Sequence, residues 1–325
     1  MGCDGCELWL PETAFLNLST RLLAQIAPDV TKAKEIVQAA FDATHTRFQF
    51  ARALGEFVPD LVHRQHLIIE LDRASACYAG VLTTARAGFS SGYPDHFEHP
   101  TLYPGRMEKM ARCVGVTQKH ADKVWLKGMP FMIFVSDMGD ALSKSISFTD
   151  LEREIIRPVS SPDGRRHVWL WLTKRPAGMA EFADWLIARG GQWPKNLVPM
   201  TSITSEKSYP RIEALKKIPA AARGLSIEPL FEKVSPNLDG IDWVIVGGES
   251  GPSARPFQLE WAFDLRSQAK QADRAFFLKQ VGAAPHLNNE PIQFRDSHGG
   301  DWSEWPKAWR TRNVPTIFIK IVTPK

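Results

Sequence analysis

The chain has 325 residues, of which 44% are hydrophobic and 23% charged, a balance typical of a globular protein rather than of a disordered or fibrous one. It contains no run of about 18 apolar residues that could cross a membrane, and its start lacks the segments of a secretory signal. We therefore expect a cytoplasmic protein with no membrane partner. The formal net charge of +4 permits a phosphate or nucleic-acid partner without requiring one.

Helical periodicity dominates the first part of the chain, residues 12–72. A set of residues recurs there at steps of three and four, which places the set on one face of a helix. Its members are Ala33, Val37, Ala40, Phe41, Thr44 and Phe48. Pro59 interrupts the pattern, and LVHRQHLIIELDR resumes it. We predict a helical insertion of two to four helices over 12–72.

Six short apolar runs rich in Val, Ile, Phe or Trp follow from Pro130 onward. They cover 130–137, 167–174, 196–204, 224–229, 242–248 and 275–279. Continuous apolar runs suit strands that are buried on both faces. Between the runs, a capping box at Thr149–Glu152 and the prolines Pro176 and Pro210 mark the starts of helices. This alternation predicts a parallel α/β architecture.

Nearly every predicted strand ends in polar residues. They are Ser136–Asp137, Thr173–Arg175, Thr201–Ser202, Glu228, Gly247–Ser250 and Lys279–Gln280. The carboxyl ends of all strands converge in a (β/α) barrel, whereas only those at the switch point do so in an open sheet. We therefore predict a full or partial (β/α) barrel built from 1–11 and 73–325. The residues expected to face its cavity are Asp137, Lys174, Thr201, Glu228, Glu249 and Lys279.

The cysteines Cys3, Cys6, Cys77 and Cys113 favour metal binding or free thiols over disulfides in a cytoplasmic chain. A structural zinc site uses four ligands, and only one C-x-x-C pair is present. Three thiolates on an iron–sulfur cluster would leave one iron open for a ligand. Free thiols, zinc and a cluster all remain open on these residues. Three cysteines slightly favour the cluster, and Cys113 is expected to be a free thiol.

Several longer stretches carry a family resemblance: GCDGCELW, CYAG, GYP, PTLYPGRMEKM, LTKRP, LSIEPLF, DWVIVGGESGPSARP and FFLKQVG. In this order they resemble the three-cysteine-motif phage-protein family, which is distantly similar to radical S-adenosylmethionine (SAM) enzymes. The resemblance implies a partial α/β barrel with a 4Fe–4S cluster on Cys3, Cys6 and Cys77. The chain departs from the ordinary C-x-x-x-C-x-x-C spacing, because the helical insertion separates Cys6 from Cys77.

The same resemblance implies an activity. SAM would bind at the open iron and be cleaved reductively to a 5′-deoxyadenosyl radical, which requires an electron donor. A companion protein from a neighbouring gene is implied as well. The phage association and the basic balance of the chain suggest nucleic acid or a nucleotide as substrate.

The strand ends receive roles from this resemblance. Gly247–Ser250 looks like the glycine-rich strand end that receives the SAM amino group, although a tight turn capped by Glu249 would have the same sequence. The residues expected to contact the cofactor are Tyr78, Thr201, Gly247, Gly248, Glu249, Ser250, Arg255 and Lys279. Those expected to be catalytic are Glu228, Lys174 and Asp137. Lys174, Arg175, Arg255 and Lys279 suit either an anion site or ordinary ion pairs.

Two other hypotheses belong to different classes. Glu228 and Glu249 on barrel strand ends would equip a glycosidase, which leaves the cysteines without a role. The segment WSEWPKAWRTR interleaves tryptophans with cations, which suits stacking on single-stranded nucleic acid. The chain would then be a cluster- or zinc-stabilised nucleic-acid-binding protein. Tryptophans at this spacing also pack together in a helix or turn.

Overall fold

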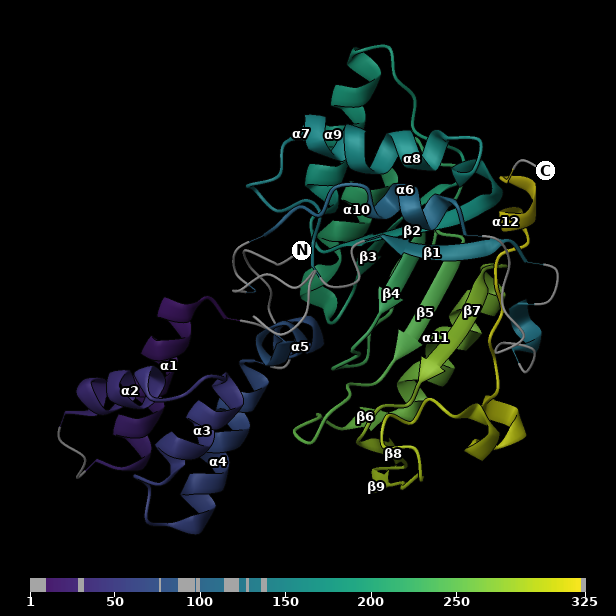
Figure 1. The fold of residues 1–325 in the computed structure, drawn as a ribbon. Helices are drawn as coiled ribbons and strands as arrows, with labels where there is room; N and C mark the ends of the chain where they lie inside the picture. The colour runs from purple at the N-terminus through teal and green to yellow at the C-terminus, as the bar shows by residue number, and fades with distance from the viewer. Residues whose placement is uncertain are drawn as a thin grey trace. The chain divides into compact units, whose positions relative to one another are not determined.

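The computed structural model of the protein describes residues 10–28, 32–75, 77–86, 97, 100–113, 123–126, 129–135 and 139–322. Its elements form two compact units, Met1–Leu102 and Tyr103–Lys325 (Figure 1). The assignment of 1–11 and 73–102 to the barrel domain stays a prediction.

The described part of residues 12–73 in the first unit contains four helices: α1 (Glu12–Ile26), α2 (Ala33–Asp42), α3 (Arg47–Gly55) and α4 (Leu61–Arg73). Their shared core includes Phe15, Leu23, Phe50, Leu54 and Leu67, all fully buried. The segment is helical, as predicted. A fifth helix, α5 (Tyr78–Arg86), follows it.

The helical pattern over 33–48 does not belong to one continuous helix. Helix α2 ends at Asp42, and α3 begins only at Arg47, where the Thr46 hydroxyl accepts a hydrogen bond from the Gln49 amide. This break changes the phase of the helical face. Phe50 is therefore buried, whereas Phe48 is 54% exposed, and the prediction that Phe48 shares one helical face with the residues of α2 is wrong.

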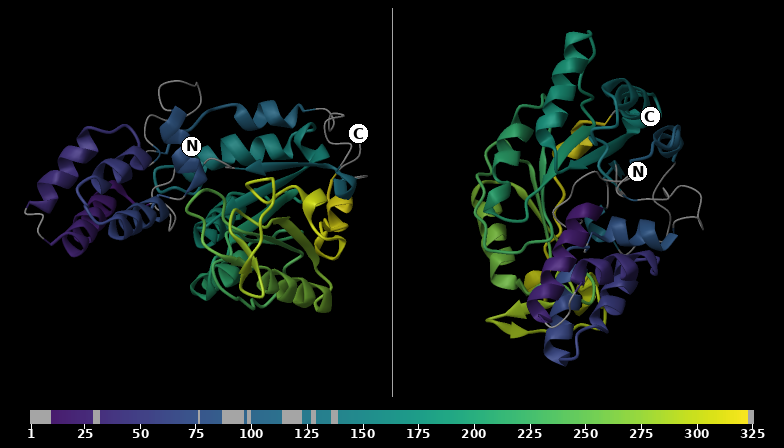
Figure 2. Two further views of the ribbon diagram at one scale, coloured as in Figure 1. Left: turned by 90° about the horizontal axis from the view of Figure 1, so that it is seen from below. Right: turned by 90° about the vertical axis from the view of Figure 1, so that its left-hand side faces the viewer.

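A parallel sheet of six strands forms the second unit, in the order β1-β2-β3-β4-β5-β7. The strands are β1 (Phe131–Val135), β2 (His167–Thr173), β3 (Leu197–Ser202), β4 (Gly224–Ile227), β5 (Trp243–Gly247) and β7 (Ala275–Gln280). All six fall on the six apolar runs, which confirms the parallel α/β prediction. The sheet curls into a half-barrel, the partial form of the predicted barrel (Figures 1 and 2).

Helices cover the outer face of this sheet (Figure 1). They are α6 (Arg106–Ala111), α7 (Phe148–Leu151), a π-helical turn (Glu152–Ile156), α8 (Arg157–Ser160), α9 (Pro176–Ala188), α10 (Pro210–Lys216) and α11 (Leu259–Gln271). Pro176 and Pro210 occupy the first helical position, as predicted. The capping residue before α7 is Ser147, which accepts from the Asp150 amide at 3.1 Å, so the predicted start at Thr149 lies two residues too late.

A second core lies on the inner face of the half-barrel. Side chains alternate between the faces of a strand, and Leu170, Trp243 and Ile245 belong to the inward set. Phe318 of α12 (Ile317–Lys320) packs against them, with its ring 5.5 Å from that of Trp243. Toward the carboxyl ends of β3, β4 and β7, the inward positions are instead polar. They are Ser202, Ser226, Glu228 and Lys279.

A small sheet of β6 (Phe257–Gln258), β8 (Pro285–Leu287) and β9 (Glu290–Pro291) completes the second unit. Over the described ranges of both units, none of the helices combines the length and the apolar character that crossing a membrane requires.

Candidate functional site

Glu228 and Lys279 form an ion pair on the inner face of the half-barrel. The Lys279 Nζ lies 3.0 Å from each oxygen of the Glu228 carboxylate. Glu228 follows β4 and Lys279 belongs to β7, and β5 lies between these strands, so the pair reaches across β5. The Glu228 side chain is 17% exposed and that of Lys279 is 53% exposed. The carboxylate is thus held in place, while the ammonium still faces solvent.

Gly247 makes room for this pair. It ends β5 at an inward position, below the Glu228 carboxylate. A Cβ at Gly247 would lie 3.0 Å from the Glu228 Oε1, closer than nearly all contacts that such an atom makes. The glycine therefore allows the side chains of two neighbouring strands to meet over the strand between them.

Glu249 and Arg255 form a second ion pair, which closes the loop after β5. The guanidinium donates to both carboxylate oxygens, at 2.7 Å from Nη2 and 2.9 Å from Nε, and the Arg255 amide donates at 3.0 Å. The Glu249 side chain is only 7% exposed, and the Arg255 guanidinium lies 3.5 Å from the centre of the Phe231 ring. Glu249 must release Arg255 before it can accept the ammonium of a ligand. Its role as a SAM contact stays a prediction.

Gly248 and Ser250 join the ends of β5 and β7. The Gln280 amide group donates to the Gly248 carbonyl at 3.0 Å and to the Ser250 hydroxyl at 2.8 Å. A Cβ on Gly248 would lie 2.4 Å from the Val281 carbonyl oxygen, so only glycine fits there. The packing of the two strand ends accounts for this glycine without a ligand, and its contact with SAM also stays a prediction.

The ends of β2 and β3 present a different set of groups. The Thr201 hydroxyl is fully buried and donates to the Thr173 carbonyl at 2.8 Å. Alternation along β3 therefore turns Ser202, rather than Thr201, to the inner face. Lys174 directly follows β2, where its amide donates to Asp140 at 3.2 Å. Arg175 beside it donates to the Leu142 carbonyl at 3.1 Å.

Asp140 organises this second set and was not singled out from the sequence. Its carboxylate accepts hydrogen bonds from the Thr173 hydroxyl at 2.8 and 2.9 Å and from the Leu142 amide at 3.0 Å. The loop after β1 is thereby tied to the end of β2. A further residue that sequence reasoning missed is Phe134, which is 47% exposed at an inward position of β1. Period-two alternation, extended from Met132, would have found it.

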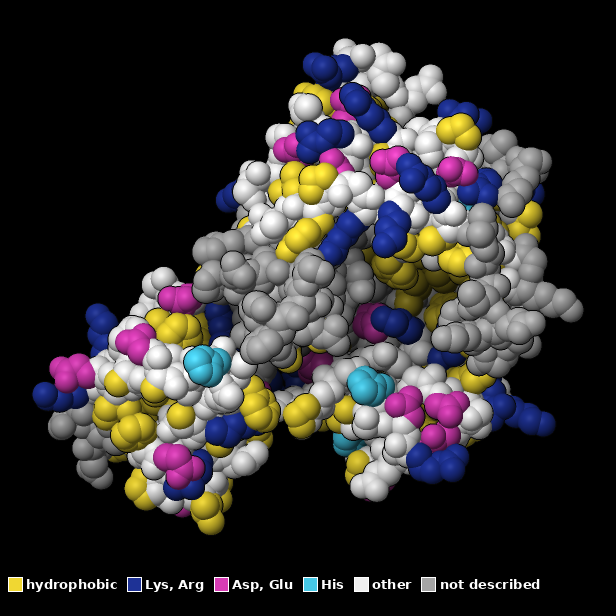
Figure 3. Space-filling model, in the orientation of Figure 1, with side chains coloured by type: hydrophobic (Ala, Val, Ile, Leu, Met, Phe, Trp, Pro, Cys, Tyr) yellow, Lys and Arg dark blue, Asp and Glu magenta, His cyan; other side chains and the backbone are white. Residues whose placement is uncertain are grey.

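The predicted residues thus form two groups in the second unit, Glu228 with Lys279 and Gly247 on β4, β5 and β7, and Lys174 at the end of β2. Arg255 and Lys279 each form an ion pair with a carboxylate, which favours the interpretation of these cations as ordinary ion-pair partners over that of a common anion site. Figure 3 shows the surface hollowed on this side of the sheet, with hydrophobic, acidic and basic side chains in the hollow.

The predicted cluster ligands involve the first unit. Cys77 is half-buried, and its carbonyl accepts from the Val81 amide at 2.9 Å in the first turn of α5. The Leu10 amide donates to the Ala74 carbonyl at 3.1 Å, and Arg47 donates to the Leu10 carbonyl at 2.7 Å. The two ends of the four-helix insertion are therefore held together.

Several predicted residues lie outside the described part of the chain. These are Cys3, Cys6, Asp137 and the side chain of Tyr78. Within the residues that the structure does describe, no three His, Cys, Asp or Glu side chains gather as a metal site. Cys113, expected to be a free thiol, is half-buried after α6 and is not in a disulfide.

The tryptophans of WSEWPKAWRTR pack inside the second unit. The ring centres of Trp302 and Trp305 each lie 5.1 Å from the Arg312 guanidinium carbon, and that of Trp125 lies 4.6 Å from it. Arg312 donates to the carbonyls of Leu278, Lys279 and Gly300. Burial lowers the pKa of Arg312 to about 10. These rings therefore surround a cation of the same chain. This favours the interpretation that the tryptophans of this segment pack within the protein.

One family model matches residues 73–306, well over half of the chain, and its description is "Protein of unknown function (DUF5131)". The match begins at the last residue of α4, so the helices α1 to α3 lie outside it. Neither the curated proteins nor the solved structures contain a match to the chain.

Proposed function

The chain belongs to the DUF5131 family of proteins of unknown function. From the resemblance of its motifs to a family that is distantly similar to radical SAM enzymes, we propose that it is a radical SAM-like iron–sulfur enzyme. In this proposal Cys3, Cys6 and Cys77 hold a 4Fe–4S cluster, and the strand ends of the half-barrel bind SAM. The half-barrel of parallel strands with polar carboxyl ends supports it, because ligands of such folds bind at that end.

The hydrogen bond between Leu10 and Ala74 is the observation that carries the proposal. A gap of some seventy residues between Cys6 and Cys77 is the main objection to a shared cluster. Cys6 precedes Leu10 by four residues, and Cys77 follows Ala74 by three. Since the insertion returns the chain to the point where it left, its length adds little to the distance that the two cysteines must cover.

The donor set also fits the proposed group. Thiolates are the usual ligands of iron–sulfur clusters. Cys77 directly precedes α5, and the amino end of a helix stabilises a nearby negative charge, such as that of a metal-bound thiolate. Three thiolates leave one iron open, and there a bound cluster would supply the electron that cleaves SAM.

Glu228 and Lys279 support SAM as the ligand of the second unit. They present a carboxylate and an ammonium side by side, which match the ammonium and carboxylate of an amino-acid moiety. Gly247 leaves the space in which these two side chains meet. The other residues proposed to contact SAM are Tyr78, Gly248, Glu249, Ser250 and Arg255, and Lys174 and Asp137 are proposed to act with Glu228 on the substrate.

The proposal includes partners that this chemistry needs. An electron donor has to reduce the cluster, and a companion protein would act with the chain. Nucleic acid or a nucleotide is the proposed substrate class. Thiolate ligands persist in a reducing compartment, so a cytoplasmic location belongs to the proposal.

Iron and sulfide analysis of protein purified without oxygen tests the cluster. We expect iron and sulfide in the unaltered chain and their loss in Cys3→Ala, Cys6→Ala and Cys77→Ala. Cys113→Ala is the matched control, because it removes a half-buried thiol elsewhere and should retain the cluster. Stoichiometric zinc without iron, after reconstitution as well as purification, would contradict the proposal.

A further inference from the structure

We propose that the second unit carries a phosphate-binding pocket of its own, formed between α11, the turn before β7 and the segment 308–313. The pocket has a volume of about 550 Å³. Its charged lining consists of Arg266, Lys270 and Arg274 against the single carboxylate of Asp273. The site does not depend on the proposed radical chemistry, since none of its residues takes part in the strand-end site.

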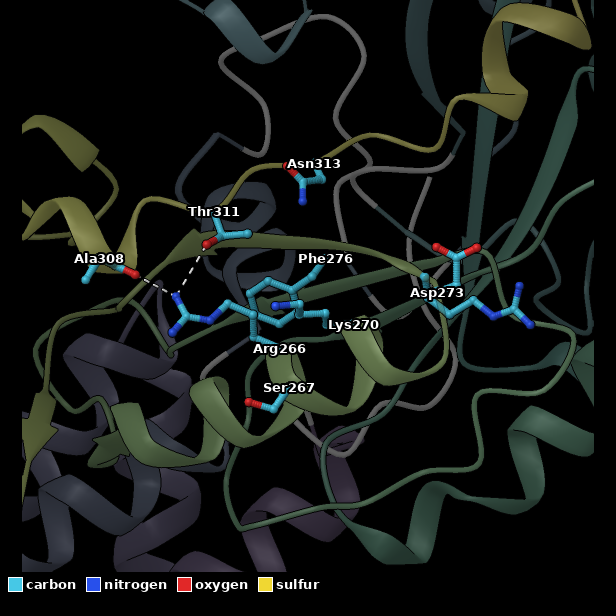
Figure 4. A pocket seen from close by; sticks show the side chains of 9 residues that line it. Arg266, Ser267, Lys270, Asp273, Phe276, Ala308, Thr311 and Asn313 are labelled. Carbon is cyan, nitrogen blue, oxygen red and sulfur yellow. Dashed lines mark hydrogen bonds between the residues drawn. The ribbon is translucent and has the colours of Figure 1, made fainter.

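The pocket lies at the opposite end of the sheet from Glu228 and Lys279. Asp273 and Arg274 immediately precede β7, whereas Lys279 lies near its carboxyl end. Lys279 lies five positions after Arg274 along the extended strand, which corresponds to roughly 16 Å. Figure 4 shows Arg266 extending from α11 toward Ala308 and Thr311 on the C-terminal segment, with Lys270 on the same helix.

The cations of this pocket are not neutralised by the protein. Among the described residues, no carboxylate lies within ion-pair distance of Arg266, Lys270 or Arg274. Arg266 donates to the Ala308 carbonyl at 2.6 Å and approaches the Thr311 hydroxyl at 3.4 Å, which fixes its guanidinium at the pocket wall. Elsewhere in the second unit, by contrast, Lys233 pairs with Asp264, Arg255 with Glu249, and Lys279 with Glu228.

Arg274 is the third cation of the lining. Its Nε is buried within the protein, so a ligand in the pocket would meet the terminal nitrogens of its guanidinium. A phosphate oxygen is the acceptor that a guanidinium prefers, because its tetrahedral oxygens accept two parallel hydrogen bonds.

The charge and the volume of the pocket restrict the chemical class of the ligand further. The three cations exceed the Asp273 carboxylate by two charges, which balances a phosphate monoester at neutral pH. The volume falls within the range of pockets that hold organic ligands, so it also accommodates the group that carries the phosphate. The chemistry is therefore a phosphate ester of nucleotide size, either a free nucleotide or one phosphate of a nucleic-acid strand.

Calorimetric titration of the full chain with AMP, and anisotropy titration with a fluorescent single-stranded DNA oligonucleotide, test the site. Lys270→Gln and Arg274→Gln should each weaken binding about tenfold, the effect of losing one charged hydrogen bond. Asp273→Asn should strengthen binding, since it removes the only negative charge and Asn tolerates the left-handed backbone at this position (φ 55°). Lys195→Gln removes an exposed cation outside the pocket and should leave binding unchanged.

Each result of these titrations either supports or overturns the proposed phosphate site. Binding of AMP with this order of variants supports a nucleotide, and binding of the oligonucleotide alone with the same order supports a nucleic-acid strand. Absence of binding to both probes, or equal effects of Lys270→Gln and Lys195→Gln, overturns the proposal. Lys270 and Asp273 are exposed, so their variants test the site even where Arg274→Gln fails to fold.

Discussion

Leu10 and Ala74 stand at the two ends of the four-helix insertion, and the Leu10 amide donates a hydrogen bond to the Ala74 carbonyl at 3.1 Å. The Leu10 carbonyl is held in turn by Arg47, whose guanidinium also lies 4.4 Å from the centre of the Phe15 ring. The chain therefore leaves and re-enters the insertion at nearly the same place. The length and sequence of α1 to α4 can change without changing the positions of the residues that flank the insertion.

Arg47→Met should lower both stability and iron content. The change keeps much of the side-chain volume but leaves the Leu10 carbonyl without its charged donor, a loss of about 1–3 kcal/mol in the free energy of unfolding. The ends of the insertion then separate more easily, and the cluster should be retained less well. Chemical denaturation and iron analysis measure the two effects.

Arg64→Met is the matched control for Arg47→Met. Arg64 donates to the Val58 carbonyl at 2.9 Å in the same unit, away from the ends of the insertion. It should lower stability without changing the iron content per folded chain. Equal iron content in both variants would show that closure of the insertion does not matter for the cluster.

Gly247→Ala should weaken the Glu228–Lys279 pair. The added Cβ would press on the Glu228 Oε1 and displace the carboxylate, at a cost of about 1–3 kcal/mol in stability. SAM affinity, measured by calorimetry, should fall as well. Gly178→Ala in α9 meets nothing within 4 Å and should stabilise the chain by about 0.5–1 kcal/mol with unchanged SAM affinity. A Gly247→Ala variant that binds SAM normally would remove this glycine from the site.

The two glutamates should respond differently to replacement by glutamine. Glu249→Gln leaves Arg255 without its carboxylate in a mostly buried setting and should lower the free energy of unfolding by about 1–3 kcal/mol. Glu228→Gln should cost less stability, because Lys279 is half exposed, but should lower SAM turnover more. Thermal unfolding and turnover assays on both variants separate these effects. The reverse order of stability loss would be inconsistent with the two ion pairs.

His167 should make the second unit sensitive to acid. Burial lowers the pKa of His167 below its ordinary value of 6.5, and its Nε2 lies 3.0 Å from the Ala111 carbonyl. The unfolded chain therefore binds a proton more readily than the folded one. The contribution of the neutral His167 side chain to the free energy of unfolding is complete above pH 6.5. It is lost as the pH falls through the pKa of His167 in the folded state.

Urea unfolding at pH 7.5 and 5.5 measures this effect. His167→Gln, which can still donate to the Ala111 carbonyl, should reduce the difference in unfolding free energy between the two pH values. His63→Gln, at an exposed position of the first unit, should leave the difference as it is. An unchanged difference in His167→Gln would mean that other groups cause the acid sensitivity.

The architecture could be predicted because its signals are local and repeated. The strands of the sheet are mostly apolar, since one side packs on helices and the other largely on the inner core, and such runs stand out from their neighbours. Pro176 and Pro210 mark helix starts because their fixed backbone angle suits the first helical position. The curl into half a barrel depends on strand twist and on the lengths of the connections, which these patterns do not contain.

The site was harder to predict because polar residues at a strand end do not reveal their partners. Glu249 was expected to meet a ligand, and the structure pairs it with Arg255 six residues later. Thr201 was expected to face the cavity, but alternation along β3 turns it toward the helices and turns Ser202 inward. The packing of Trp305 and its neighbours around Arg312 requires segments far apart in sequence, so spacing alone could not distinguish it from a stacking surface.

Reductive cleavage of SAM tests the central claim most directly. Cluster-loaded protein, prepared without oxygen, reduced, and assayed with and without its companion protein, should convert SAM to 5′-deoxyadenosine, which chromatography with mass detection measures. Cys77→Ala should abolish the product, and Cys113→Ala should retain it. A reduced, cluster-loaded protein that neither binds nor cleaves SAM, even with the companion present, would contradict the assignment of the chain as a radical SAM-like enzyme.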